Sequence, residues 1–464
     1  MRLVPYLSLV LLLVSASVPA QTAAVIDTVQ THWGPVPPPS EGRTTTVQPA
    51  DTPLWKHLVR VPYHVASVPV NALDWVLTET LTQAEEWGLF APAENLVKGL
   101  RGPLGVFWLP TGSLGEERGL EYGLVGQRPG VFGPLGVLKA SATYSTKRSS
   151  SVTVGLRTDY GQSHWLEVGG GRVRDSKQEY FGQGWNSDED DEAVYRRQLD
   201  WAGTGWRHEW LGGLESTLTA QYTSVGAWAS RYDDDEAMAL VFAGRLPAGY
   251  EAISSGFTGS VKLGLSTVPA SGNPVRGTRA VLRAEHFRNS DDGDVVFTTL
   301  GASMEQYLDL GLPQRVLALK VWYLQQENHG DDAIPFIRLL NNRDPYKLRG
   351  FGSQRFHAQG STGLTVEYRW PCWMQNRPGG AGLDAYIFGD TGQYFDEADE
   401  LAVTRLLVSG GVGLRLIGSD GGFGARAEIA WGREGTHIRV SAKQLFNFIK
   451  AGFYDGSEPL PLQR

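Results

Sequence analysis

The chain has 464 residues, a formal net charge of -8 at pH 7 and a single cysteine, Cys372. The acidic balance argues against a nucleic-acid partner, and one cysteine cannot form a disulfide within the chain. The histidines show no metal-ligand spacing, so the sequence predicts neither a metal site nor another cofactor.

Residues 1–20 have the pattern of a secretory signal peptide. Met1 and Arg2 give a basic start, residues 3–14 form a short apolar run, and small residues lead up to Ala20. The run is too short for a membrane-spanning helix, and the alternative is a buried N-terminal helix. No later apolar stretch is long enough to span a membrane as a helix. We therefore expect an exported chain, located in the periplasm, the extracellular space or the outer membrane.

Two segments precede the main body of the chain. Residues 21–70 are rich in Pro and Thr, which predicts an extended tether. Residues 71–103 predict an amphipathic helix, because Asn71 can cap the N-terminus and Leu77 and Leu81 share one face. Two positions are open for this helix: against the periplasmic rim of the domain that follows, or inside that domain as a plug.

From residue 104 onward, apolar and polar residues alternate in segments of about ten residues. The even positions of 214–222 are apolar apart from Ser216, and the odd positions of 257–265 are apolar. Such strands have one apolar and one polar face. Cations stand on the polar face, among them Lys262, Arg415 and Arg439, where they would destabilise a sandwich core. A water-filled lumen accommodates them, so the pattern predicts an all-β transmembrane β-barrel that is apolar outside and polar inside.

The same segments predict sixteen antiparallel strands within residues 104–446, an even number as in bacterial single-chain barrels. We expect these strands near 104–112, 118–127, 136–146, 151–159, 164–174, 193–208, 213–225, 254–267, 277–288, 295–309, 316–327, 362–371, 382–394, 404–417, 423–433 and 436–446. Residues 447–464 then form a C-terminal tail.

Acidic clusters fall in the connections after odd-numbered strands, at 188–192, 233–236, 291–294 and 331–332. With both termini in the periplasm, these connections are the long outer loops of a barrel. We hypothesise that the acidic loops share divalent cations with the phosphates of lipopolysaccharide. Outer-membrane lipids and lipopolysaccharide are therefore the expected partners.

Three motifs near the C-terminus carry more information than the rest of the chain. They are Leu348-Arg349-Gly350-Phe351 in a long loop, Thr365-Val366-Glu367-Tyr368-Arg369-Trp370 in one strand, and Phe388-Gly389-Asp390-Thr391-Gly392 in the next. On both strands the carboxylate alternates with large apolar residues, so each carboxylate faces away from the apolar side. Gly350 and Gly352 are expected to let the loop backbone turn sharply beside the arginine.

Together with Gly411-Val412-Gly413-Leu414-Arg415 and a last strand that ends at Phe446, these motifs resemble the BamA/TamA family. This is the bacterial surface antigen superfamily of outer-membrane assembly and translocation barrels. The resemblance is specific across 336–446 and colinear from about residue 104. It implies a location in the bacterial cell outer membrane. Residues 21–103 lack the strand pattern of the POTRA modules that the family's assembly machines carry.

The resemblance also implies a loop-lock network in the lumen, formed by Arg349, Gly350, Phe351, Glu367 and Asp390. In the family, the loop arginine folds back into the lumen and reaches acidic residues on two neighbouring strands. A guanidinium binds carboxylates in a bidentate fork that lysine cannot copy. The network holds the loop and suggests no turnover chemistry.

Two functions are open on these grounds. The first is assistance in the insertion or translocation of outer-membrane proteins or lipids, through a weak seam between the first and last strands, with other outer-membrane proteins as partners. The second is a passive outer-membrane pore or structural barrel that keeps the loop lock only for folding. An enzyme is not expected, because Ser, His and Asp are scattered without a nucleophile elbow.

Overall fold

The computed structural model describes residues 106–442, with gaps at 116–117, 134, 161–162, 231–236, 269–273, 292, 313–314, 344–347, 375–381 and 418–424. The predicted signal peptide, tether, N-terminal helix and C-terminal tail lie outside the described residues. Within the described part of the chain, no helix is long and apolar enough to cross a membrane.

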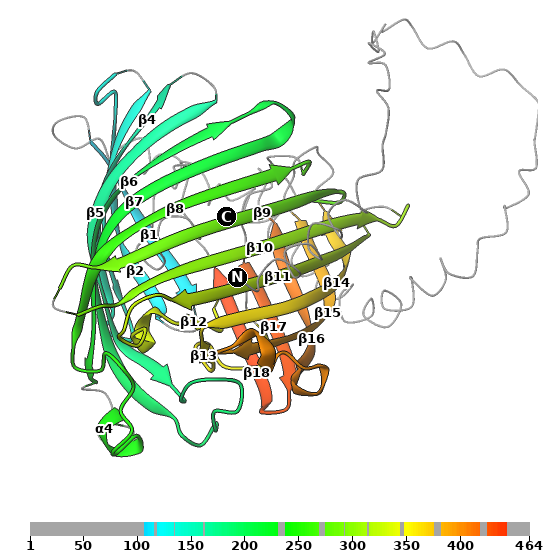
Figure 1. The fold of residues 1–464 in the computed structure, drawn as a ribbon. Helices are drawn as coiled ribbons and strands as arrows, with labels where there is room; N and C mark the ends of the chain where they lie inside the picture. The colour runs from blue at the N-terminus through cyan, green and yellow to red at the C-terminus, as the bar shows by residue number, and fades with distance from the viewer. Residues whose placement is uncertain are drawn as a thin grey trace, which may run out of the picture. The chain divides into compact units, whose positions relative to one another are not determined.

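Long antiparallel strands make up most of the described residues (Figure 1). They are β1 (Phe107–Gly115), β2 (Gly119–Pro129), β3 (Gly136–Ser145), β4 (Ser150–Tyr160), β5 (His164–Tyr180), β6 (Ala193–Glu209), β7 (Leu214–Ala229), β8 (Ile253–Ser266), β9 (Gly277–Asn289), β10 (Val296–Asp309), β11 (Val316–Asn328), β14 (Gly360–Met374), β15 (Gly382–Phe395), β16 (Leu407–Ile417), β17 (Ala425–Gly432) and β18 (Gly435–Ala442). The loop before β14 holds the short pair β12 (Leu340–Asn341) and β13 (His357–Ala358). The helices are α4 (Met238–Val241) and 3-10 turns at Leu211–Gly213, Phe336–Arg338, Ala398–Glu400 and Val403–Arg405.

Each long strand pairs with its neighbours in chain order, which gives one curved antiparallel sheet (Figure 1). Tight turns make this order possible. Between β6 and β7, Gly212 and Gly213 have φ of 75° and 78°, a backbone conformation that glycine adopts without steric cost. Among the described residues, which end at Ala442, the strand order returns to β1 through one residue pair, Leu114 opposite Ala442 of β18. By contrast, β1 pairs with β2 along its whole length.

Each predicted strand overlaps a strand of the structure, and the all-β antiparallel fold is confirmed. The count of sixteen strands and full closure into a barrel stay predictions, because the two end strands share a single pair. Some strand starts differ by a few residues: β1 begins at Phe107 and not near 104, and β16 begins at Leu407 and not near 404. Arg405 belongs to a 3-10 turn, where its guanidinium donates to the carbonyl of Glu400 at 3.2 Å, so it does not share the strand face of Ser409.

The two faces of the sheet differ as the alternation predicts. In β8, Val261 and Leu263 are 46% exposed, while Lys262 between them is only partly exposed. Arg415 donates to Asp384 at 2.7 Å, and Arg439 is 8% exposed between Ile438 and Val440, which are 73% and 46% exposed. These three charged side chains therefore lie on the inner face, and the large apolar residues next to them lie on the outer face.

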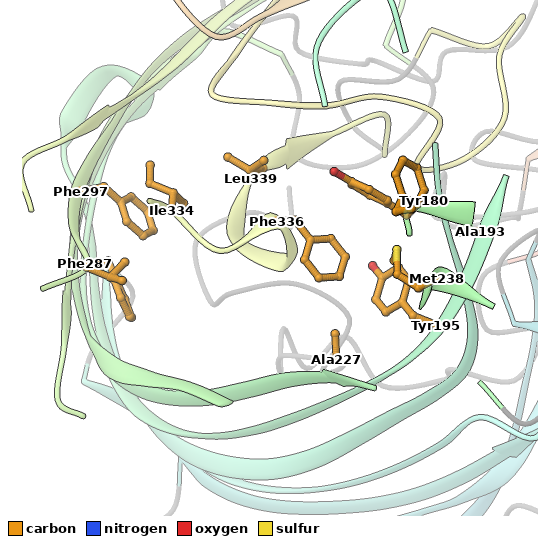
Figure 2. Packing of buried hydrophobic residues seen from close by; sticks show 12 residues of the cluster. Tyr180, Ala193, Tyr195, Ala227, Met238, Phe287, Phe297, Ile334, Phe336 and Leu339 are labelled. Carbon is orange, nitrogen blue, oxygen red and sulfur yellow. The ribbon is translucent and has the colours of Figure 1, made fainter. Parts of the chain in front are cut away.

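A hydrophobic cluster lies inside the curve of the sheet, near the end that carries the long loops (Figure 2). Phe336 of the loop between β11 and β14 is at its centre, with ring centroids 4.9 Å from Tyr180 and 5.0 Å from Tyr195. The cluster also contains Ala193, Ala227, Met238, Phe242, Phe287, Val295, Phe297, Ile334 and Leu339. Burial of a large apolar side chain contributes about 1.5–3 kcal/mol, so this packing holds the loop inside the sheet.

Candidate functional site in the interior loop

The loop between β11 and β14 brings Arg349 onto the inner face of β14 and β15. Its turn is organised by the buried Asn342, whose side-chain amide donates to the carbonyl of Gly352 at 2.7 Å. The side-chain oxygen of Asn342 accepts from the backbone N–H of Leu348 at 2.7 Å and from the hydroxyl of Tyr394 on β15 at 3.2 Å. One asparagine therefore fixes the segment that presents the arginine.

Arg349 binds both carboxylates named from the sequence. Its guanidinium donates to Asp390 through Nε at 2.8 Å and Nη2 at 2.7 Å, which is the bidentate fork, and to Glu367 through Nη1 at 2.5 Å. The backbone N–H of Arg349 also donates to Asp390 at 3.1 Å. The guanidinium carbon lies 3.5 Å from the centre of the Phe388 ring, which adds a cation–π contact. Phe388 therefore shares the inner face of β15 with Asp390, so the expectation that this carboxylate faces away from the large apolar residues was wrong for β15.

Further charged residues surround this core. Glu367 accepts two bonds from Arg369, at 2.8 and 2.6 Å, and Asp390 accepts from the hydroxyl of Thr365 at 2.9 Å. Oε2 of Glu428 on β17 lies 3.9 Å from Nη1 of Arg349. Burial disfavours the charge on Arg349, but the hydrogen bond to Asp390 and the surrounding carboxylates outweigh it and raise the pKa of the guanidinium above its usual value. The arginine is therefore charged at every accessible pH.

The glycine beside the arginine is needed for a reason that the sequence did not give. The backbone does turn here, because the N–H of Phe351 donates to the carbonyl of Leu348 at 3.3 Å, but Gly350 does not adopt a positive φ, so the turn alone does not require a glycine. A Cβ built on Gly350 would lie 2.9 Å from the carbonyl oxygen of Trp431 and closer still to the side chain of Ser409. Gly350 therefore permits close contact between the loop backbone and strands β16 and β17. Gly352 begins a second turn, in which the N–H of Arg355 donates to its carbonyl at 3.3 Å, and a Cβ there would meet nothing nearer than 3.9 Å.

Phe351 anchors the turn by packing. It is fully buried beside Phe356, at 5.3 Å between ring centroids, and belongs to a cluster with Leu348, Tyr394 and Trp322. The structure thus brings together all five residues of the predicted network: Arg349, Gly350, Phe351, Glu367 and Asp390.

Three arginines that sequence reasoning did not assign to this loop also hold it. Arg439 of β18 donates to the carbonyls of Arg349 and Phe351. Arg355 donates to Glu434, in the turn between β17 and β18, at 2.9 Å. Arg338 donates to Ser254 of β8 through Nε at 2.8 Å and stacks on Phe287, an aromatic ring of β9, at 4.0 Å. Only Arg439 carried a sequence signal, as an inward cation on the last strand.

His357 of β13 is a buried titratable group next to this network. Its ring contacts Tyr180, at 5.1 Å between centroids, and neither ring nitrogen has a hydrogen-bond partner. Burial, reinforced by the charges of Arg343 and Arg355, lowers the pKa of His357 to about 3. The imidazole is therefore neutral near pH 7.

No cation site was found among the acidic loops within the described ranges. The cluster at 233–236 and residue 292 of the cluster at 291–294 lie outside those ranges. In the part of the chain that is described, no three His, Cys, Asp or Glu side chains gather in a way that could hold a metal ion. The hypothesis of shared divalent cations gains no support from these residues.

Solved structures similar to this chain include bacterial outer-membrane proteins. BamA from Haemophilus ducreyi lacking POTRA domains 1-3 matches with a TM-score of 0.54 and 13% identity, over 73% of this chain and 70% of that chain. CdiB from Escherichia coli matches with a TM-score of 0.48 and 13% identity, over 72% of this chain and 62% of that chain. CdiB from Acinetobacter baumannii matches with a TM-score of 0.41 and 12% identity, over 73% and 59%.

This chain thus spans less than two thirds of either CdiB chain. No protein-family model matches the sequence, and no curated protein matches it. At 13% identity, the similarity to BamA shows a shared outer-membrane β-barrel fold and nothing about activity.

Proposed function

We propose that this chain is a sixteen-stranded β-barrel of the bacterial outer membrane that assists the insertion or translocation of outer-membrane proteins or lipids. The site of action is the seam between β1 and β18, and no catalytic chemistry is involved. Among the described residues, which end at Ala442, these strands are joined by one pair, Leu114 opposite Ala442, and this observation carries the proposal. The BamA-like fold supports the membrane location.

A weak seam leaves two strand edges available for pairing. Strand β18 pairs with β17 from Gly435 to Ala442, and β1 pairs with β2 from Phe107 to Gly115. Within the described residues, the opposite edges of β1 and β18 meet at one position only. An unpaired edge is a template for another strand, so a strand of a client protein could extend either side of the seam.

The interior loop holds one side of this seam. Arg439 on β18 binds the carbonyls of Arg349 and Phe351, and Arg355 binds Glu434 in the β17–β18 turn. Gly350 rests against the same hairpin. The Arg349 lock on β14 and β15 therefore also braces the terminal hairpin, and release of the loop would weaken the seam.

The alternative, a passive pore, requires a continuous aqueous path. The cluster centred on Phe336 places loop residues inside the curve of the sheet, which would narrow such a path. A structural barrel without transport activity is consistent with the same packing. Conductance in planar bilayers, together with unchanged assembly of other barrels when the gene is deleted, would favour the alternative.

A disulfide across the seam tests the proposal. The Leu114→Cys/Ala442→Cys pair, in a Cys372→Ala background, would join β1 to β18 at their one shared position. The matched control is Ala427→Cys/Val440→Cys, which joins β17 to β18 at a register pair inside a continuous ladder. We expect the seam disulfide to abolish client insertion in proteoliposomes, reduction to restore it, and the control disulfide to have no effect. Full activity of the oxidised seam variant would refute the proposal.

A further inference from the structure

A group of arginines lies on the outer face of β5 and β6, where an outer-membrane barrel faces lipid. Arg172 and Arg174 stand on β5 and Arg196 stands on β6, all three exposed. The carboxylate of Asp200 is ion-paired with Arg172, and Glu179 follows on the same face beyond the β5 bulge. The group therefore carries more positive than negative charge.

The alternation of the strands fixes the direction of these side chains. Val173 and Asp175, on the opposite face of β5, are 0% and 3% exposed, and Asp175 binds Arg197 of β6 at 3.2 Å inside the sheet. Because successive residues of a strand point to opposite faces, Arg174 on β5 and Arg196 on β6 point outward.

The register places these arginines side by side. Arg172 is opposite Asp200 and Arg174 is opposite Gln198, to which it donates at 3.1 Å. Arg196 is the next outward residue of β6 after Gln198, and its guanidinium lies 5.5 Å from the ring of Trp228 on β7. Same-face residues of a strand are about 7 Å apart and neighbouring strands about 5 Å apart. At this spacing, the arginines could contact two phosphate groups of one lipid headgroup.

The outer face of β5 changes from apolar to basic between Val168 and Arg172. Val168 is 49% exposed, whereas Arg172 and Arg174 follow on the same face toward the end with the long loops. The β3–β4 turn adds a further exposed cation there, since the carbonyl of Arg148 accepts from the hydroxyl of Ser176 at 2.8 Å. Cations on a lipid-facing surface are costly at the bilayer midplane and nearly neutral close to the interface. The arginines therefore mark the level of the headgroups.

We infer that Arg172, Arg174 and Arg196 form a binding site for the phosphate groups of a membrane lipid in the leaflet at the loop end. The guanidinium fork matches phosphate oxygens and binds them with paired hydrogen bonds. If that leaflet faces the cell exterior, the ligand is phosphorylated lipopolysaccharide. The inference rests on the membrane placement of the proposed function, but not on the seam. Here the arginine side chains contact the lipid phosphates directly, whereas the earlier hypothesis placed divalent cations between acidic loops and those phosphates.

Binding of fluorescent bisphosphorylated lipid A to the detergent-solubilised protein tests this site. The variant is Arg174→Gln/Arg196→Gln. The matched control is Arg245→Gln/Arg276→Gln, which removes the same charge from two exposed arginines, one in a long loop and one before β9 at the opposite end of the sheet. Each cation near a membrane surface contributes about fivefold in affinity, so we expect about 30-fold weaker binding by the variant and less than about threefold by the control. Dephosphorylated lipid A should bind both variants and the wild type equally weakly.

Three outcomes would overturn the inference. Equal losses in both double variants would indicate a general charge effect, and equal affinity for dephosphorylated lipid would exclude phosphate recognition. Displacement by millimolar inorganic phosphate would indicate a site for free anions. Normal lipid binding by a protein that fails in client insertion would refute the proposed function alone, so the two failures are distinguishable.

Discussion

Replacement of Arg349 by alanine should destabilise the protein far more than the loss of an ordinary surface arginine. The Arg349 guanidinium binds the carboxylate of Asp390, a residue that is only 2% exposed. After the change, Asp390 keeps only its bond from Thr365 and a backbone N–H. Glu367 is less affected, because it keeps both bonds from Arg369. The cost therefore arises mainly at Asp390.

Removal of one partner of a buried pair costs about 3–5 kcal/mol, because the other charge is left uncompensated. We expect this loss in the free energy of unfolding of Arg349→Ala, measured by urea denaturation from lipid vesicles. Arg349→Lys should lose about half as much, since an ammonium keeps the charge but cannot form the fork. Arg245→Ala is the control: its side chain is 66% exposed, and its ion pair with Asp191 is worth about 1 kcal/mol or less.

Protease sensitivity gives an independent readout of the same change. A loop released from β14 and β15 should be cleaved between β11 and β14 in Arg349→Ala but not in Arg245→Ala. If Arg349→Ala and Arg245→Ala were equally stable and equally resistant, water would be screening the network, and the argument from burial would be wrong.

Three further predictions concern the residues around the lock. Gly350→Ala should lower the free energy of unfolding by about 1–3 kcal/mol, because the added methyl group overpacks against β16. The urea midpoint should fall while the slope stays the same, and an unchanged midpoint would show that the strands move to accommodate the methyl group. Arg439→Gln should leave the Arg349 lock intact but make the terminal hairpin exchange amide hydrogens faster, and unchanged exchange would remove the proposed brace. For His357, the pKa of about 3 in the folded protein lies below the ordinary 6.5, so the stability that neutral His357 contributes is complete above pH 6.5 and is lost as the pH falls toward 3. The loss is about 1.4 kcal/mol per pH unit, and His357→Phe should remove that slope; a slope equal to that of the wild type would contradict the buried neutral ring.

Local periodicity was enough to predict most of the sheet. Lys262, Arg415 and Arg439 alternate with apolar residues in their strands, and a two-residue period assigns each to the inner face whatever the distant contacts are. The end of a strand is harder to place. Arg405 continues the alternation in sequence, yet it lies in a 3-10 turn, because turns are set by local hydrogen bonds that the period does not encode.

The contacts of the long loop depended on different information. Arg349, Glu367 and Asp390 were paired through a resemblance to known barrels, since no spacing rule relates a loop to strands that follow it. Arg338 and Arg355 had no such guide. Their partners, Ser254 and Glu434, are 84 and 79 residues away in the chain, and only the folded sheet brings them together.

The Arg349 loop lock is proposed to hold the seam between β1 and β18 closed. The most direct test is a distance measurement across that seam. Spin labels at Leu120 of β2 and Ile438 of β18, both outward and 50% and 73% exposed, would report it in proteoliposomes of a Cys372→Ala protein. We predict one narrow distance distribution with Arg349 present and an added population at longer distance in Arg349→Ala. Identical distributions in the two proteins would contradict the coupling of lock and seam.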